Sequence, residues 1–359
     1  MIARSKIGRR ELMAGSGLLA ATALLPRGAH AQQGSVTFSS WGGAFQDALR
    51  EAMLTPASRA LGITVREDTT NGIQDIRAQI TARRVTWDVT EQELPTAETL
   101  KRENSLEPID YRIVSTDGIP KELVNSHYVG FINFTKVIAW QVSTYGDNGP
   151  KTWADFWDVA KFPGKRSLFQ QVNYALEAAT MAQGVPIPDV YKVLATPQGM
   201  ERAWAKLEEI APHITVWYRG GSQSAQLLRD GEVDIIHMGH NRVESVIASG
   251  RRVGYQFDGG TMDIDALMVP RGAPNRENAM RLINELLKPD AQARLAKAMP
   301  LGPVNTNAFR SGILTEAEAL KVNTHPANVD KQLLVDANFY VGRLDQLTER
   351  FERVKQRRR

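Results

Sequence analysis

Two aspartates, Asp263 and Asp265, stand two residues apart where an apolar segment that runs to Pro270 begins. Side chains at i and i+2 of a β-strand point to the same face of a sheet, so both carboxylates are expected on one face. An unpaired carboxylate buried at the start of an apolar strand is costly. We therefore predict that Asp265, with Asp263 beside it, neutralises the ammonium group of a bound solute. The alternative is a hydrogen bond at a hinge.

Cationic and polar side chains gather at the end of another predicted strand. Trp217 and Arg219 lead into Gly-Gly-Ser-Gln-Ser at 220–224, whose free amides at a helix start suit an oxyanion or a hydroxyl. A guanidinium fork recognises a carboxylate. We therefore predict that Trp217, Arg219 and Gln223 line the ligand site opposite Asp265. Arg219 and Arg242 would also suit the carboxylate of an amino acid or ω-amino acid. Alternatively, both arginines form salt bridges with acidic residues of the protein surface.

An aromatic residue and two glutamates follow other predicted strands. Trp41 and Gly42 come after the strand 36–39 and before a helix, at the sheet edge where α/β proteins bind ligands. We predict that Trp41 stacks on the apolar part of the solute and that Gly42 permits close approach of the backbone; core packing is the alternative for Trp41. Glu91 and Glu93 follow a later strand. Glu93 is a further candidate partner for the ammonium, whereas charged loop residues are usually only solvated.

Alternating strands and helices position these residues. Strands are predicted at 36–39, 63–65 and 87–90 with helical spacing of apolar residues between them, and a second strand–helix cycle follows over 167–248. Such alternation is typical of an α/β fold with a parallel or mixed sheet. No Pro/Ser-rich linker separates the two cycles. We therefore predict two α/β lobes joined by a strand hinge, with a ligand-binding cleft between them.

The predicted organisation has explicit boundaries. The parts are a twin-arginine signal peptide at 1–31, lobe 1 at 34–137 plus 264–310, lobe 2 at 138–263, and C-terminal helices at 311–359 that pack on the lobes. Within lobe 2, Thr152 is the predicted N-cap of a helix, and Asp155 completes an acidic variant of the capping box. Trp153 and Trp157, four residues apart, are expected to pack in the core.

The N-terminal residues are interpreted as an export signal. Arg9 and Arg10 precede a weakly apolar stretch at 18–25, and Ala-His-Ala at 29–31 supplies the small-x-small pattern that signal peptidase requires. Paired arginines fit a twin-arginine signal better than a general secretory one; a basic flexible tail is the alternative. Because the chain has no cysteine for lipid attachment, cleavage near Ala31 predicts a freely diffusing periplasmic protein.

Composition excludes several classes of protein. The 359 residues include no cysteine, which excludes disulfides, thiol nucleophiles and metal–thiolate sites. The formal net charge is +4, but the chain without residues 1–31 is neutral and its last residues are basic. The folded part before those last residues is therefore acidic, and no nucleic acid is expected to bind it. Gly-x-Ser-x-Gly, Gly-x-Gly-x-x-Gly and His-Glu-x-x-His motifs are absent. With only His237 and His240 close in sequence, we expect no metal, no cofactor and no catalysis.

Several segments carry a resemblance to a known family. They are Thr-Trp-Ala-Asp-Phe-Trp-Asp at 152–158 with Lys-Phe-Pro-Gly-Lys-Arg at 161–166, then 39–43, 224–228 with 231–234, and 265–275. On these segments the chain resembles the periplasmic solute-binding proteins of ABC importers, in the group that contains spermidine/putrescine binders. The resemblance implies the type II two-lobed periplasmic binding protein fold. It also implies a receptor, expected to be a monomer, that closes on its solute and delivers it to permease subunits in the inner membrane.

The resemblance also assigns residues. In polyamine binders, aromatic rings box the methylene chain and carboxylates meet each ammonium group, and Trp41 and Asp265 match that pattern. Other positions depart from that pattern: Asp263 and His240 each stand where polyamine binders commonly have a tryptophan. Amide side chains stand where acidic residues would hold the second amine of a polyamine, at Gln170, Gln171 and Asn173. The carboxylates available to replace them are Glu91, Glu93 and Glu177. The expected solute is a polyamine such as putrescine or spermidine; the alternatives are a zwitterion such as γ-aminobutyrate, then iron binding or an exported enzyme.

Overall fold

A mixed β-sheet runs through residues 34–356, the part of the chain that the computed structural model describes. The predicted signal peptide therefore lies outside the described residues. The strands are β1 (Ser35–Ser40), β2 (Thr64–Thr69), β3 (Val89–Glu93), β4 (Tyr128–Gln141), β5 (Arg166–Phe169), β6 (Ile214–Tyr218), β7 (Ile235–Gly239), β8 (Val253–Tyr255), β9 (Thr261–Met268), β10 (Gly302–Pro303) and β11 (Leu333–Leu334). Their order is β2-β1-β3-β9-β4-β7-β5-β6, with β8 and β10 paired to β4 and β11 paired to β9.

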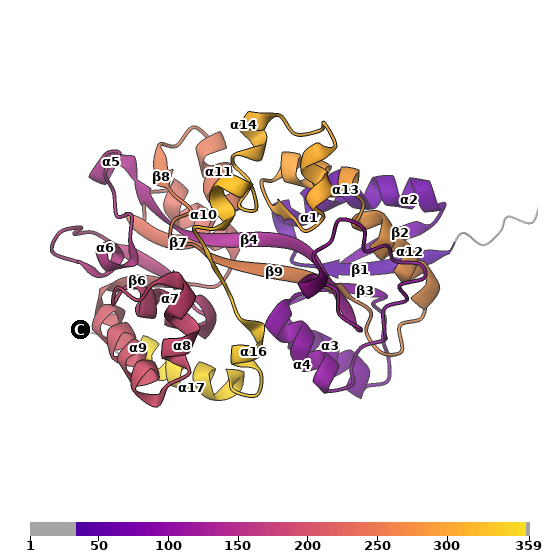
Figure 1. Cartoon of the computed structure of the whole chain (residues 1–359), viewed down its shortest axis with the longest axis horizontal. Coiled ribbons are helices and arrows are strands. Elements are labelled where there is room, and N and C mark those ends of the chain that lie inside the picture. The colour runs from indigo at the N-terminus through magenta and orange to yellow at the C-terminus, as the bar shows by residue number, and fades with distance from the viewer. Residues whose placement is uncertain (1–33, 357–359) are drawn as a thin grey trace, which may run out of the picture. The chain divides into compact units, whose positions relative to one another are not determined.

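Strands β4 and β9 form the centre of the sheet and connect two groups of parallel strands (Figure 1). They pair antiparallel from Tyr128 opposite Met268 to Lys136 opposite Thr261. On one side, β9 pairs antiparallel with β3, and β1 lies parallel between β3 and β2. On the other side, β4 pairs antiparallel with β7, and β5 lies parallel between β7 and β6. The predicted α/β class with a mixed sheet is confirmed.

Short helices cover the sheet. The α-helices of the described residues are α1 (Gly43–Leu49), α2 (Thr55–Leu61), α3 (Ile73–Thr81), α4 (Leu94–Arg102), α5 (Val142–Tyr145), α6 (Trp153–Trp157), α7 (Val172–Met181), α8 (Val190–Leu194), α9 (Pro197–Ile210), α10 (Gly221–Arg229), α11 (His240–Ala248), α12 (Arg276–Leu286), α13 (Pro289–Ala298), α14 (Glu316–Ala319), α15 (Pro326–Val329), α16 (Ala337–Tyr340) and α17 (Leu344–Lys355). Between residues 34 and 356, none has the length and apolar character needed to span a membrane.

Apolar side chains gather in separate cores on the two sides of the central strands. One core joins β1 to helices α12 and α13, and includes Leu282. Another joins α6 to α9 with the C-terminal helix α17, and includes Trp204 and Phe351. Strand β4 contributes Phe131 to the first core and Ile138 to the second. The stretch of β4 between these two residues therefore lies where the cores meet.

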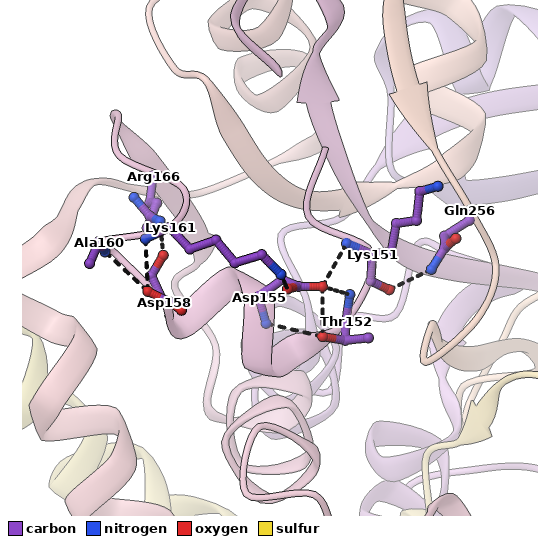
Figure 2. Close-up of polar contacts among 8 residues, drawn as sticks. All are labelled: Lys151, Thr152, Asp155, Asp158, Ala160, Lys161, Arg166 and Gln256. Atoms are coloured by element: carbon purple, nitrogen blue, oxygen red, sulfur yellow. Dashed lines mark hydrogen bonds and ion pairs between the residues drawn. The ribbon is translucent and has the colours of Figure 1, made fainter. Parts of the chain in front are cut away.

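Helix α6 begins as the sequence predicts. The hydroxyl of Thr152 accepts the N–H of Asp155 at 3.0 Å, and Oδ2 of Asp155 accepts the N–H of Thr152 at 3.1 Å, so both halves of the capping box are present (Figure 2). Lys161 donates to the other oxygen of Asp155 at 2.8 Å. Trp153 and Trp157 are buried, which confirms their expected role in packing. This segment, the most family-like one in the sequence, thus stabilises the fold locally.

Strand β3 lies later in the chain than the predicted strand at 87–90. It runs over Val89–Glu93, so Glu91 and Glu93 belong to the strand and not to a loop after it. The cause is pairing with β9, which places Glu91 opposite Leu267 and Glu93 opposite Asp265. Two charged residues in a short segment are typical of a solvated loop, and only the neighbouring strand makes an extended, buried conformation favourable here.

Candidate functional site

A cleft of about 520 Å³ is lined by residues from both groups of strands. Of the residues predicted to bind a ligand, those that line it are Trp41, Gly42, Glu93, Arg219, Gln223, Arg242 and Asp265. Gln170 and Gln171 line it too. Trp217 and Asp263 do not. Most residues singled out for their chemistry therefore share one cleft, although they come from segments far apart in the chain.

Trp41 enters the cleft through a turn that requires glycine. Gly42 and Gly43 have φ angles of 72° and 62°, in the left-handed region that other residues adopt only with strain. A β-carbon at Gly42 would also lie 3.1 Å from Cγ2 of Thr69. Trp41 is 38% exposed, and its Nε1 donates to Oδ2 of Asp265 at 3.1 Å. The indole is thus tied to the carboxyl group while much of its ring remains accessible to a ligand.

The acidic side of the cleft is built by strand register. Asp263 and Asp265 are paired with Phe134 and Ile132 of β4, which confirms that the two aspartates share one face of β9. Glu93 lies opposite Asp265 on β3, and Glu91 lies two residues before it on the same face. The four carboxyl groups therefore gather on one face of adjacent strands.

Burial favours the protonated form of two of these carboxyl groups, Asp265 and Glu91. Burial raises the pKa of Asp265 well above its usual range, and Glu91 and Glu93 add to the shift. Burial likewise raises the pKa of Glu91 to about 7, although hydrogen bonds from Asp265 and Ser40 lower it. The hydroxyl of Ser40 lies 2.7 Å from Oε2 of Glu91. The remaining oxygens, Oε1 of Glu91 and Oδ1 of Asp265, have no other partner among the described residues. Burial beside Glu91 therefore favours the protonated form of Asp265.

A lysine from β4 lies beside this acidic face. The Nζ atom of Lys136 is 3.6 Å from the ring centre of Tyr174, 4.6 Å from that of Phe134 and 4.8 Å from that of Phe169. Lys136 is 7% exposed and lines the cleft, and its ammonium makes no hydrogen bond or ion pair with another described residue. Burial lowers its pKa, while Glu93, Asp263 and Asp265 oppose that shift. The ammonium is therefore surrounded by aromatic faces, and Glu93, Asp263 and Asp265 favour its charged form.

Tyr174 completes this aromatic cage from the other group of strands. Its φ is 75°, a conformation in which a bulky residue is strained, so the start of α7 is kinked there. Its hydroxyl lies 2.8 Å from Oδ2 of Asp263 and 3.1 Å from Oε1 of Glu93. These contacts, with the position of its ring over Lys136, supply the interactions that hold a strained backbone.

The cationic side of the cleft contains two arginines in different environments. Arg242, at the start of α11, is half-buried, and burial lowers its pKa. Its guanidinium lies against the backbone of Gly221, where an added β-carbon would be 2.6 Å from Nε. Arg219 is exposed, and its backbone N–H donates to Oε1 of Gln223 at 2.8 Å. Neither guanidinium forms an ion pair or hydrogen bond within residues 34–356, so the expected alternative, salt bridges to surface acids, is not observed.

Three predicted residues lie elsewhere. Trp217 packs against Phe351 of α17 with ring centres 5.4 Å apart, because successive residues of β6 face opposite sides and Tyr218 takes the side toward the cleft. Asp263 is fully buried behind Tyr174, and its Oδ1 accepts the N–H of Ile264 at 2.7 Å. Glu177, an available second carboxylate, accepts hydroxyls from two tyrosines of the second core, Tyr191 at 2.7 Å and Tyr340 at 2.6 Å.

The two histidines considered as metal ligands have separate partners. Nε2 of His237 lies 3.1 Å from the hydroxyl of Thr261, while Nδ1 of His240 lies 3.2 Å from the carbonyl of Thr135. Burial lowers the pKa of both imidazoles. Among residues 34–356 there is no cluster of three or more side chains arranged to hold a metal ion.

Sequence reasoning missed Lys136 and the rings around it. Phe134, Phe169 and Tyr174 are not among the residues that the sequence predicts to bind a ligand. The available signal was a single lysine inside a long apolar stretch, Tyr128–Gln141, since a charge in a buried strand needs partners. The identity of those partners depends on β9 and α7, which are distant in sequence.

Comparisons with known proteins agree with this architecture. A family model described as bacterial extracellular solute-binding protein matches residues 53–322. A γ-aminobutyric acid-binding protein of Pseudomonas aeruginosa is 34% identical over 328 residues, which cover 90% of this chain and 91% of that protein. A spermidine/putrescine-binding periplasmic protein of Escherichia coli is 24% identical over 211 residues, which cover 56% of this chain and 58% of that protein.

A solved structure is similar over nearly the whole chain. It is that of the periplasmic binding protein MotA from A. tumefaciens B6 in complex with glucopine, with a TM-score of 0.85 and 37% identity. The alignment covers 89% of this chain and 99% of that one. The arrangement of strands and helices described above is thus that of a periplasmic binding protein.

Proposed function

Since this chain belongs to the family of bacterial extracellular solute-binding proteins, we propose that its solute is a small zwitterion, with an ammonium group at one end and a carboxylate at the other, such as γ-aminobutyrate. Like its relatives, the chain is a substrate-binding protein of an ABC transporter and not an enzyme. One observation carries the choice of solute: a single cleft contains the Asp265 carboxyl group and the unpaired guanidinium of Arg242. A solute with both charges meets a partner at each.

The ammonium end is assigned to Asp265, which lines the cleft. Glu91, which is fully buried and does not line it, acts through Asp265. Burial favours the protonated form of both carboxyl groups, and an arriving ammonium favours their charged form, so its binding displaces a proton. Trp41, bonded to Asp265 through Nε1, presents its ring to the methylene chain and to the ammonium. Glu93, opposite Asp265, adds negative potential.

The carboxylate end is assigned to Arg242. The N–H donors of its guanidinium are available to a solute because they bond to no other described residue. A guanidinium pairs with a carboxylate through two parallel hydrogen bonds. Burial strengthens such a pair because water screens it less. Arg219, Gln223 and the N–H groups at the start of α10 line the same side of the cleft and add further donors.

The relatives support a solute that contains an amine. The P. aeruginosa relative, 34% identical, is named for γ-aminobutyric acid, and the E. coli relative, 24% identical, is named for spermidine and putrescine. The relative with higher identity and coverage is therefore the one whose named ligand carries both charges. That order agrees with the two arginines in the cleft.

A polyamine is the second candidate. Four carboxyl groups gather on one face of β3 and β9, namely Glu91, Glu93, Asp263 and Asp265. A polyamine uses several such groups at once. Asp263, however, is fully buried behind Tyr174, and Gln170 and Gln171 line the cleft where a second amine would need carboxylates.

We further propose how the chain is organised around this cleft. The chain forms lobe 1 at 34–137 plus 264–310 and lobe 2 at 138–263, and the C-terminal helices at 311–359 pack on them. The lobes close on the solute by bending of β4 and β9 where these strands pass from one lobe to the other. The closed monomer delivers the solute to permease subunits in the inner membrane. Export by the twin-arginine route and cleavage near Ala31 place it in the periplasm, in keeping with its extracellular and periplasmic relatives.

Calorimetry on the purified protein tests the solute class. The titrants are γ-aminobutyrate, pooled α-amino acids, putrescine and spermidine, together with n-butylamine and butyrate, which each lack one charged end of γ-aminobutyrate. We expect a zwitterion to bind and each truncated compound to bind at least about tenfold more weakly, since each lost charge pair is worth more than ~1.4 kcal/mol. Tight binding of putrescine with no response to any zwitterion would overturn the proposal.

A further inference from the structure

We propose that Lys136 determines the solute class of this cleft, because its ammonium occupies the aromatic cage of Phe134, Phe169 and Tyr174 as a built-in cation. The inference rests on the proposed function, the binding of a zwitterion. It names Lys136 as the residue that discriminates zwitterions from diamines. Three rings around one ammonium form the kind of site that recognises alkylammonium groups of ligands. Here the chain itself supplies that group, with Nζ 3.6 Å from the ring centre of Tyr174.

The position of Lys136 is set by secondary structure and not by a flexible loop. It lies in β4 opposite Thr261 of β9, two residues after Phe134, so both side chains point to the same face. Phe169 ends β5, and the kink at Tyr174 turns the third ring over the ammonium. Lys136, Phe134 and Phe169 all line the cleft, so the cage opens onto the space that the solute enters.

The acidic groups that a diamine would use already act on Lys136. Glu93, Asp263 and Asp265 all act on its ammonium, although none lies within ion-pair distance. A second ammonium entering this part of the cleft therefore meets an occupied cage and a like charge. A solute carboxylate is instead attracted by Lys136 and by Arg242. Lys136 thus weakens the binding of diamines and strengthens the binding of zwitterions.

Substitution of Lys136 by methionine removes the charge and keeps an unbranched side chain of similar length. In calorimetric titrations, we expect Lys136→Met to shift the ratio of the γ-aminobutyrate and putrescine Kd values by at least about tenfold toward putrescine. Lys136→Arg, which keeps the charge, should retain the wild-type order. An unchanged ratio in a folded Lys136→Met, in a protein whose wild type binds γ-aminobutyrate, overturns the role of Lys136 and leaves the proposed function standing. Wild-type protein that responds to putrescine and to no zwitterion overturns both.

Measurements on wild-type protein keep the inference testable if Lys136→Met does not fold. n-Butylamine and putrescine have the same four-carbon chain and differ by one ammonium group. The built-in cation predicts that putrescine binds at least about tenfold more weakly than n-butylamine, since the second ammonium meets Lys136 and the arginines. Putrescine binding as tightly as n-butylamine, or more tightly, contradicts the inference whatever the variants show.

Discussion

Substitution of Arg242 tests how the cleft binds the carboxylate of the solute. Its guanidinium bonds to no other described residue, so replacing it by glutamine breaks no contact that holds the fold together. Removing one partner of a buried charge pair costs ~2–5 kcal/mol, whereas an exposed pair contributes ~0–1 kcal/mol. Arg242 is half-buried. For Arg242→Gln we therefore expect a loss of ~2–3 kcal/mol, which is about 30- to 150-fold in the Kd for γ-aminobutyrate.

The assay compares two ligands with two variants. Calorimetry with γ-aminobutyrate should show the full loss for Arg242→Gln, while n-butylamine, which has no carboxylate, should bind both proteins within about threefold. Arg219→Gln is the matched control, because Arg219 lines the same side of the cleft but is exposed. It should cost less than ~1 kcal/mol.

A second perturbation moves Arg242 without removing its charge. A β-carbon at Gly221 would lie 2.6 Å from Nε of Arg242, so Gly221→Ala pushes the guanidinium away from the helix start. We expect the same direction of change as for Arg242→Gln, with a smaller loss. Unchanged γ-aminobutyrate binding by Arg242→Gln, or equal losses for γ-aminobutyrate and n-butylamine, would refute the assignment of Arg242 to the solute carboxylate.

Three further predictions concern the acidic side of the cleft. Asp265→Asn should weaken γ-aminobutyrate binding by ~2–5 kcal/mol in calorimetry, whereas Asp258→Asn on the surface should leave it unchanged; equal titration curves for wild type and Asp265→Asn would remove Asp265 from the site. Since burial raises the pKa of Glu91 to about 7, binding of an ammonium should release a proton, and affinity should increase from about pH 5.5 to about pH 8. Titrations in buffers of different ionisation enthalpy measure that release, and proton uptake would contradict it. Because the folded pKa of Glu91 lies above its usual value of 4.5, its contribution to the unfolding free energy of the ligand-free protein is complete below about pH 4.5 and is lost as pH rises toward 7. Denaturation of wild type and Glu91→Gln across this range should show a flatter pH dependence for the variant, and parallel curves would contradict the assignment.

Local features of the fold and site could be predicted from the sequence. The capping box at Thr152 depends on hydrogen bonds that span three residues, and the shared face of Asp263 and Asp265 follows from the two-residue period of a strand. The turn after Trp41 depends on two consecutive glycines, whose φ values other residues reach only with strain. Each of these features depends on residues adjacent or nearly adjacent in the chain.

Other features required knowledge of which elements pack together. The two-residue period places Trp217 and Tyr218 on opposite faces of β6, but it does not say which face the helix α17 covers. Glu91 and Glu93 have the composition of a loop, and pairing with β9 places them in a strand. The partners of Lys136 come from three separate elements, so a lone lysine in an apolar stretch shows only that partners must exist.

By itself, the sequence determined the α/β class, the family, and seven of the residues that line the cleft, because these follow from periodicity, local hydrogen bonds and motifs. The tertiary structure alone decided how those residues are charged and paired. Trp41 donates to Asp265 across 224 positions of the chain, and the raised pKa values of Glu91 and Asp265 exist only because neighbouring strands bury both groups. Burial and proximity depend on contacts between distant segments, and these set the pKa values and the unpaired charges on which solute choice depends.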